Sequence, residues 1–321
     1  MNRRALLGLL AATPLPRTGR TQPAYPTRPI RVVVAWPAGG GVDTPTRIVS
    51  VAMGRVLGQP LVLDNRGGAT GSIGAAEAAR AVPDGYTILS DGLSLTTNAL
   101  TMRGLTYDPL TAFTPISQIV AAPMLLVVRA DHPARSLAQL LAMARENPGK
   151  LTYFSSGIMG GPHTTGLALL RRAGATASHV SYRGGSQSIA GVMGGDTDFG
   201  FSTLPQAVPL VREGRLRALG VSSPERMPAL PDIPTIAEQG FPGFQKLETA
   251  SLWAPAGTPP QAIARLQEAV VAALADPDVR SRLEILGMTP VGSTPAELGA
   301  NTRAHTEAVA ELYRSEGIKP D

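Results

Sequence analysis

The chain has 321 residues, of which 43% are hydrophobic and 17% charged, with a formal net charge of +5 and no cysteine. This composition indicates a globular rather than a disordered protein, and the lack of cysteine excludes disulfides and thiol chemistry. The four histidines lack metal-binding spacing, so we expect no metal and no other cofactor. The basic residues are dispersed without interleaved aromatic residues, so no nucleic-acid partner is expected.

Residues 1–24 are expected to form an export signal and linker. Arg3 and Arg4 precede a short apolar run over residues 5–12. That run is too short to span a bilayer, and it fits the hydrophobic part of a signal peptide. The arginine pair indicates twin-arginine export. A disordered basic tail is the alternative.

A strand, a glycine turn and a helix are predicted for the stretch IRVVVAWPAGGGVDTPTR, residues 30–47. The apolar, β-branched start is typical of a strand buried on both faces of a parallel sheet. Gly39, Gly40 and Gly41 leave bare backbone N–H groups, and Asp43 is a good N-cap for the helix. Free N–H groups and the helix dipole together predict an anion site. A tight turn that binds nothing is the alternative, and Trp36 is the aromatic residue expected to contact a ligand.

The same strand–turn pattern continues through the first hundred residues, which predicts a parallel sheet with helices on its faces. Gly68, Gly71 and Gly74 do not have the spacing of a dinucleotide fingerprint, which argues against a nucleotide site. The predicted elements are a strand over 60–65, a turn over 66–72, a helix over 73–82, a strand over 86–90 and polar loop segments over 91–94 and 96–98.

A second α/β unit follows a long apolar stretch over residues 116–130 and a capping box at Ser136. Its predicted strands cover 151–155, 179–182, 197–202 and 216–222, with glycine turns at 156–161 and 183–186 and helices from 162, over 189–193 and around 206–213. Capping boxes at Thr235, Thr258 and Thr294 predict a helical C-terminal third. A short apolar strand over 252–254 is placed where the chain crosses back to its first domain.

The glycine turns of the two units are expected to face each other, because ligands of open α/β sheets bind at the carboxyl ends of the strands. Each charge-assisted N–H bond contributes about 1.5–3 kcal/mol. Four or five of them, less the cost of association, predict roughly micromolar binding of a small anion. Two roles are predicted for Asp198: it is either a buried carboxylate with its hydrogen bonds satisfied or part of the polar wall of the cleft.

A hydrolase is the catalytic alternative, with Ser155 or Ser156 as nucleophile and His163 as base. A dyad needs its base oriented by a third group, and no third member is evident. The sequence also has no nucleophile elbow and no Walker motif. His163 is expected to pack or hydrogen-bond in the first turn of its helix, so we favour a binding protein that is not an enzyme.

These stretches also resemble the Bug (TctC-like) family of extracytoplasmic solute-binding receptors associated with tripartite tricarboxylate transport. The resemblance runs from Tyr25 almost to the C-terminus. The matching stretches are YPTRPIRVVVAWPAGGGVDTPTR, VLDNRGGATGSIGAAEAARAVPDGYTIL, SSGIMGGPHTTG, YRGG, RALGVSSPERMPALPDIPTIAEQGFPGF and APAGTPP.

The resemblance implies a type II periplasmic-binding fold of class α/β, in which two domains, each a mostly parallel sheet flanked by helices, are joined by crossing strands. Domain 1 is then expected over residues 25–123 plus 250–321, and domain 2 over 124–249, with the ligand cleft between them. The implied ligand is a small carboxylate: a di- or tricarboxylate, an acidic amino acid or an aromatic acid. The implied protein is a periplasmic monomer that serves membrane components of a tripartite transporter or a sensor.

On positions that match the motifs, the resemblance implies a clasp from each domain. The first comprises Pro37, Ala38, Gly39, Gly40, Gly41, Val42 and Asp43, and Ser90 and Asp91 lie at the end of the third strand. The second comprises Ser155, Ser156, Gly157, Gly160, Gly161, His163 and Thr164, with Tyr182, Arg183 and Gly184 nearby. Backbone amides and water are expected to grip the ligand carboxylate.

Overall fold

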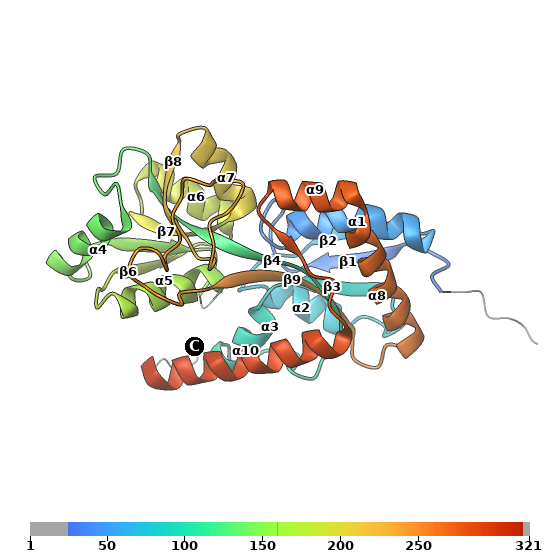
Figure 1. Ribbon diagram of the computed structural model, residues 1–321. Coiled ribbons are helices and arrows are strands. Elements are labelled where there is room, and N and C mark those ends of the chain that lie inside the picture. Colours follow the sequence, from blue (N-terminus) through green and yellow to red (C-terminus); the bar gives the residue numbers. More distant parts are fainter. Residues whose placement is uncertain (1–24, 159, 317–321) are drawn as a thin grey trace, which may run out of the picture.

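The structure, a computed structural model, describes residues 25–158 and 160–316. It has the predicted α/β architecture, and within these residues ten strands form one mixed sheet flanked by helices (Figure 1). The strand order is β2-β1-β3-β9-β4-β7-β5-β6, and β8 and β10 both pair with β4. The expected export signal lies outside the described residues.

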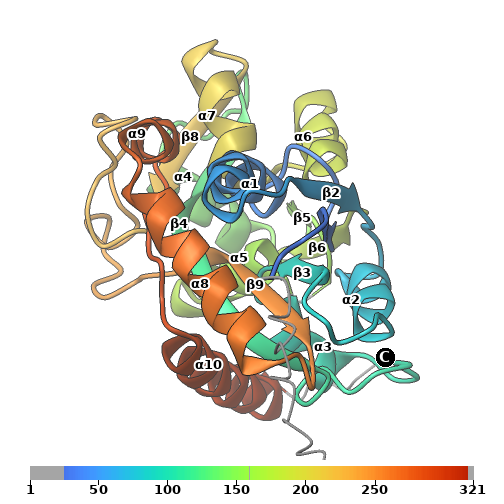
Figure 2. The ribbon, with the colours of Figure 1, turned by 90° about the vertical axis from the view of Figure 1, so that its right-hand side faces the viewer.

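The first lobe contains a parallel core in which β1 pairs with both β2 and β3. Helices α1, α8 and α9 cover one face of this sheet, and α2, α3 and α10 cover the other (Figure 2). Its elements are β1 (Ile30–Val34), α1 (Asp43–Leu57), β2 (Leu61–Asn65), α2 (Ser72–Ala79), β3 (Thr87–Asp91), α3 (Ser94–Thr101), α8 (Pro260–Ala275), α9 (Pro277–Ile285), β10 (Thr289–Pro290) and α10 (Pro295–Glu316).

The second lobe repeats the arrangement, because β5 pairs in parallel with both β6 and β7. Its elements are α4 (Leu137–Glu146), β5 (Thr152–Ser155), α5 (Gly161–Arg172), β6 (Ser178–Ser181), α6 (Gly185–Gly194), β7 (Phe199–Thr203), α7 (Leu204–Arg212) and β8 (Leu216–Val221). The predicted strands of both units therefore form in the predicted order, with bounds that shift by one to three residues.

Two long strands, β4 (Phe113–Arg129) and β9 (Leu247–Pro255), connect the lobes (Figure 1). They pair with each other antiparallel, and β9 also pairs with β3. From Met124 onward β4 pairs with β7 and β8 instead. The partner change after Pro123 marks the point where β4 leaves the first lobe and enters the second.

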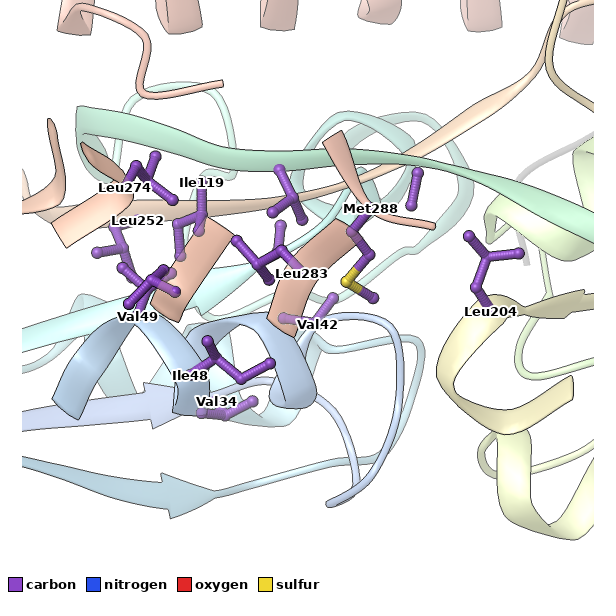
Figure 3. Packing of buried hydrophobic residues seen from close by; sticks show 14 of the residues in the cluster. Val34, Val42, Ile48, Val49, Ile119, Leu204, Leu252, Leu274, Leu283 and Met288 are labelled. Atoms are coloured by element: carbon purple, nitrogen blue, oxygen red, sulfur yellow. The ribbon is translucent and has the colours of Figure 1, made fainter. Parts of the chain in front are cut away.

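The main apolar core lies where β1 and α1 pack against the crossing strands and the C-terminal helices (Figure 3). Val32 and Val34 face this cluster, whereas Val33 faces a second cluster with Leu89 and Trp253. The uninterrupted apolar run of β1 is thus buried on both faces, as predicted. Burial of each such side chain stabilises the fold by about 1.5–3 kcal/mol. The cluster includes Val42, Ile48, Val49, Ile119, Leu252, Leu274, Leu283 and Met288.

Three of the predicted capping boxes form as hydrogen bonds, and two of them begin a helix. The Ser136 hydroxyl accepts from the Gln139 amide at the start of α4. The Thr294 hydroxyl and the Glu297 carboxylate cap α10 as expected. Thr235 and Glu238 also exchange hydrogen bonds of 2.7 and 2.9 Å, yet no helix follows. Gly240 has a φ of +100° and ends the turn.

Three further local expectations are wrong. The Thr258 hydroxyl donates to the carbonyl of Pro255, and α8 starts at Pro260 without a side-chain cap. The segments expected as a polar loop instead contain α3, because Ser94 and the threonines after it satisfy their hydroxyls on backbone carbonyls within the helix or on Asp91. Asp43 is the first residue of α1 and not its N-cap.

Candidate ligand-binding site

The two lobes meet where their parallel strands end. The first lobe presents the turns after β1 and β2, and the second presents the turns after β5, β6 and β7. Thr70 of the first lobe donates a hydrogen bond of 3.3 Å to the carbonyl of Ile158 in the second. A Cβ added to Gly184 would lie 2.8 Å from Cγ of Pro37. The turns therefore touch across the junction, and the cleft between the lobes is closed.

A small cavity of about 30 Å³ lies at the centre of this junction. Its first-lobe lining is the predicted clasp, and its second-lobe lining includes the start of α6 and α7. It has room for about one water molecule or one small polar group. The lining residues are Trp36, Pro37, Gly40, Gly41, Val42, Ser156, Gly185, Thr203, Gln206 and Glu248.

A larger cavity of about 610 Å³ shares Trp36 and Ser156 with the small one. This volume is within the range of sites that bind small molecules. Arg103 and Arg183 are among its lining residues and carry positive charge. Other lining residues are Gly68, Ala69, Thr70, Gly71, Thr101, Met102, Gly157, Ile158, His163, Leu167, His179, Ser181 and Tyr182.

The first turn keeps part of its backbone free because Asp43 satisfies the rest. Its carboxylate accepts hydrogen bonds from the Gly39 amide at 2.9 Å, from Arg47 at 2.7 Å and from Asn65 at 2.9 Å. Burial opposes ionisation of Asp43, but these donors lower its pKa below the ordinary value. Among residues 25–158 and 160–316, no acceptor is recorded for the amides of Gly40 and Gly41. These two N–H groups remain available to a ligand.

Trp36 is held in the cleft from behind. Its indole nitrogen donates a hydrogen bond of 2.7 Å to Asp91, which is fully buried and also accepts from the Ser94 hydroxyl. Burial raises the pKa of Asp91. Ser90 hydrogen-bonds the Thr46 hydroxyl at 2.7 Å. Ser90 and Asp91 therefore support the site and line neither cavity.

In the second turn, Ser155 hydrogen-bonds His179 and not His163, the histidine proposed as base. The Ser155 hydroxyl lies 2.7 Å from Nε2 of His179 and donates to the Gly157 carbonyl at 2.8 Å. His163 stacks on His179, with ring centroids 3.7 Å apart and an interplanar angle of 7°. Burial lowers the pKa of His163 to about 3 and that of His179 to about 4, so both imidazoles are neutral at pH 7. In the described part of the chain, no carboxylate hydrogen-bonds His179, so no third member orients it.

The start of α5 completes the second-lobe side. Gly160 lies close to the ring of Trp36, and Gly161 lies against the side chain of Glu248. The Thr164 hydroxyl donates within the helix to the carbonyls of Gly160 and Gly161. The amides of Ser156 and Gly185, which line the small cavity, have no recorded acceptor in the residues that the structure describes. Unused N–H groups from both lobes thus surround the small cavity, among them those of Gly40 and Gly41 in the first lobe and of Ser156 and Gly185 in the second.

Some predicted site residues lie elsewhere. Asp198 accepts hydrogen bonds from the amide and hydroxyl of Thr152, at the end of β5 opposite to Ser155. There the carboxylate is half-buried and hydrogen-bonded, and Asp198 lines neither cavity. Ala38, Gly39 and Asp43 face a separate hollow beside α9. The structure brings none of these four residues to either cavity at the lobe junction.

Sequence reasoning missed several lining residues, above all Thr70, Arg103, His179 and Glu248. Thr70 belongs to the glycine turn after β2, whose sequence suggests only a poor match to a nucleotide motif. Because β1 and β2 are parallel, this turn lies at the same edge of the sheet as the turn after β1. Glu248 is the one acidic residue of β9, and an acid in a strand at the centre of a sheet needs a partner. No group of three or more potential metal ligands is found in residues 25–158 and 160–316. Nor does this part of the chain contain a helix that is long and apolar enough to cross a bilayer.

Comparison with known proteins gives one family for most of the chain. Residues 46–303 match the sequence profile of the tripartite tricarboxylate transporter family receptor, TctC. The UPF0065 protein in the tcbD-tcbE intergenic region of Pseudomonas sp. strain P51 is 38% identical over 98% of this chain and 91% of its own length. Protein BugT of Bordetella pertussis is 30% identical over 98% of this chain and 97% of its own length.

Solved structures agree with this match. The periplasmic binding protein BugD is 31% identical over 92% of this chain and all of its own, with a TM-score of 0.87. Rpa4515 of R. palustris, solved with adipate, is 31% identical over the same shares, with a TM-score of 0.88. MatC of Rhodopseudomonas palustris, solved with bound malate, is 31% identical over 90% of this chain and 99% of its own, with a TM-score of 0.83.

Proposed function

The chain belongs to the tripartite tricarboxylate transporter receptor family, which makes it a solute-binding receptor and not an enzyme, and we propose that it captures a small carboxylate between its two lobes. The observation that carries the proposal is the set of unused amides around one central cavity, with Gly40 and Gly41 in one lobe and Ser156 and Gly185 in the other. The predicted opposition of the two glycine turns supports the same conclusion. Two related receptors hold dicarboxylates, adipate and malate.

The proposed domains comprise residues 25–123 plus 250–321 and residues 124–249, and the crossing strands support this division. The switch of β4 from β9 to β7 and β8 after Pro123 supports the first boundary. β9 returns to the first lobe near residue 250. Lobes joined by two paired strands open and close by a hinge motion, and the closed state is favoured by ligand contacts that exist only when the turns meet.

The carboxylate of the ligand is held by backbone N–H groups of Gly40 and Gly41 on one side and of Ser156 and Gly185 on the other. The helix dipoles of α1 and α6 add to the attraction for an anion. Four charge-assisted hydrogen bonds, less the cost of association, correspond to a dissociation constant of roughly a micromolar. Water bridges some of these contacts.

The remainder of the ligand occupies the larger cavity. Trp36 and Tyr182 offer apolar ring surface there, and Arg103 and Arg183 offer positive charge for a second anionic group. This mixture suits di- and tricarboxylates, acidic amino acids and aromatic acids. A cavity of about 610 Å³ is large enough for any of them.

The receptor works in the periplasm, as its family does, and is a monomer exported by the N-terminal segment. Its partners are the small carboxylate and the membrane components of a tripartite transporter, or a sensor protein. No nucleic acid takes part. A closed lobe junction such as the one observed gives a membrane partner a surface that differs between the empty and the loaded receptor.

A ligand screen tests the proposal. Purified protein is heated with panels of carboxylates, amines, sugars and nucleotides, and each hit is titrated by calorimetry. We expect only carboxylates to raise the melting temperature, with affinities near a micromolar. If amines, sugars or nucleotides stabilise the protein and no carboxylate does, the proposal fails.

A further inference from the structure

The carboxyl group of Glu248 lies between the two glycine turns. Glu248 is the second residue of β9 and pairs with Ala122 of β4, so its backbone belongs to the strands that join the lobes. A Cβ added to Gly41 would lie 2.8 Å from Oε2 of Glu248, and one added to Gly161 would lie 3.1 Å from Oε1. The acid therefore reaches both clasps at once, and glycine at 41 and 161 leaves room for it.

This carboxyl group is left without a protein partner. Within the described ranges, no residue donates a hydrogen bond to Glu248 or forms an ion pair with it. Burial raises the pKa of Glu248 to about 7, since the carboxylate loses hydration and gains no cation in exchange. The arginines of the cleft, Arg103 and Arg183, line the larger cavity and not this one.

We propose that Glu248 is the specificity residue of the cleft and selects carboxylates that also carry a cationic amine. This inference rests on the proposed function, in which backbone amides hold the ligand carboxylate next to Glu248. An ammonium group adjacent to that carboxylate would give Glu248 the charge-assisted hydrogen bond that the protein does not supply. A dicarboxylate without an amine would bring a further anion against a carboxylate that is already poorly solvated.

Matched ligand pairs that differ only by the amine test the inference. Succinate and aspartate, glutarate and glutamate, and phenylacetate and phenylglycine are titrated by calorimetry into the wild type, Glu248→Gln and Glu146→Gln. Glu146 is an exposed residue at the end of α4 and serves as the matched control. We expect the amine-bearing member of at least one pair to bind about tenfold or more tighter to the wild type and to Glu146→Gln. In Glu248→Gln the difference should fall to within about threefold, with thermal unfolding showing that the variant is folded.

The outcomes separate this inference from the proposed function. Tighter binding of the amine-free acids by the wild type would overturn the role of Glu248 and leave the receptor a carboxylate binder. An amine preference that persists in Glu248→Gln would also overturn it. Amine-free binding that weakens from pH 6 to pH 8 only when Glu248 is present would mean that the protonated acid donates to the ligand, which overturns selection for an amine. If no carboxylate of either kind binds, the proposed function itself fails.

Discussion

The indole nitrogen of Trp36 donates a hydrogen bond of 2.7 Å to a carboxylate oxygen of Asp91. Trp36 lines both cavities, whereas Asp91 is fully buried behind it at the end of β3. The pair fixes the aromatic wall of the cleft to the sheet of the first lobe. Asp91, which was expected among the ligand-binding residues but lines neither cavity, thus determines where the lining residue Trp36 stands.

The first prediction concerns this pair. Asp91→Ala leaves the Trp36 indole and the Ser94 hydroxyl without their acceptor, and each buried unsatisfied group costs about 1–3 kcal/mol. We expect a loss of about 2–4 kcal/mol in unfolding free energy together with weaker carboxylate binding. Asp91→Asn keeps one acceptor oxygen and should lose less of both. Urea denaturation and calorimetry measure the two effects, and an Asp91→Ala variant that binds and unfolds like the wild type would contradict the supporting role.

The second prediction uses two adjacent glycines of the first turn. A Cβ at Gly41 would lie 2.9 Å from Cγ2 of Thr203 in the opposite lobe, whereas a Cβ at Gly40 meets nothing closer than the Pro37 carbonyl at 3.5 Å. Gly41→Ala therefore obstructs closure, and Gly40→Ala does not. We expect Gly41→Ala to weaken ligand binding by about tenfold or more, with little change in unfolding free energy because each lobe stays intact. Equal affinities of the two variants in calorimetric titrations would count against closure at this contact.

The third prediction is a loss of stability in acid. The folded-state pKa values of His163 and His179, about 3 and about 4, lie below the unfolded value of about 6.5. Their stabilising effect is therefore complete above pH 6.5 and is lost as the pH falls towards 4 and below. We expect the unfolding free energy to fall by about 2–4 kcal/mol for each of the two histidines between pH 7 and pH 4. His163→Phe keeps a flat ring and cannot titrate, so its urea denaturation should depend less on pH; parallel profiles would contradict the assignment.

The fourth prediction has the opposite sign. The pKa of Glu248 in the folded protein is about 7, above its unfolded value of about 4.3. Folding thus favours the protonated acid, and stability is lost as the pH rises from about 4 to about 7. We expect Glu248→Gln, which stays neutral, to gain about 1–3 kcal/mol in unfolding free energy at pH 8 and almost nothing at pH 4. Chemical denaturation at both pH values checks this, and an equal gain at both would exclude a titration effect.

The sequence predicts the parts of this fold that depend on neighbours in the chain. The apolar run of β1, the glycine turns after β1 and β5, and the caps at Ser136 and Thr294 all form. It does not predict which histidine meets Ser155. That choice depends on the register of β5 and β6, which places His179 opposite Tyr153 and its ring against the end of β5.

The sequence could not predict the surroundings of Glu248, for a similar reason. Its partners in space, Gly41 and Gly161, come from different lobes and are 120 residues apart in the chain. Only the closed arrangement of the turns shows that an acid lies between them. A capping box also does not predict a helix by itself. At Thr235 the hydrogen bonds of the box form, but Gly240 ends the turn and no helix follows.

The position of β9 in the sheet sets the order in which the molecule can be completed. β9 lies between β3 and β4, yet it is synthesised more than a hundred residues after either of them. A nascent chain that has emerged only as far as β8 carries every strand of the second lobe, while the first lobe still has a gap where a central strand belongs. The second lobe can therefore assemble early during translation, and the first must wait until nearly the whole polypeptide has left the ribosome.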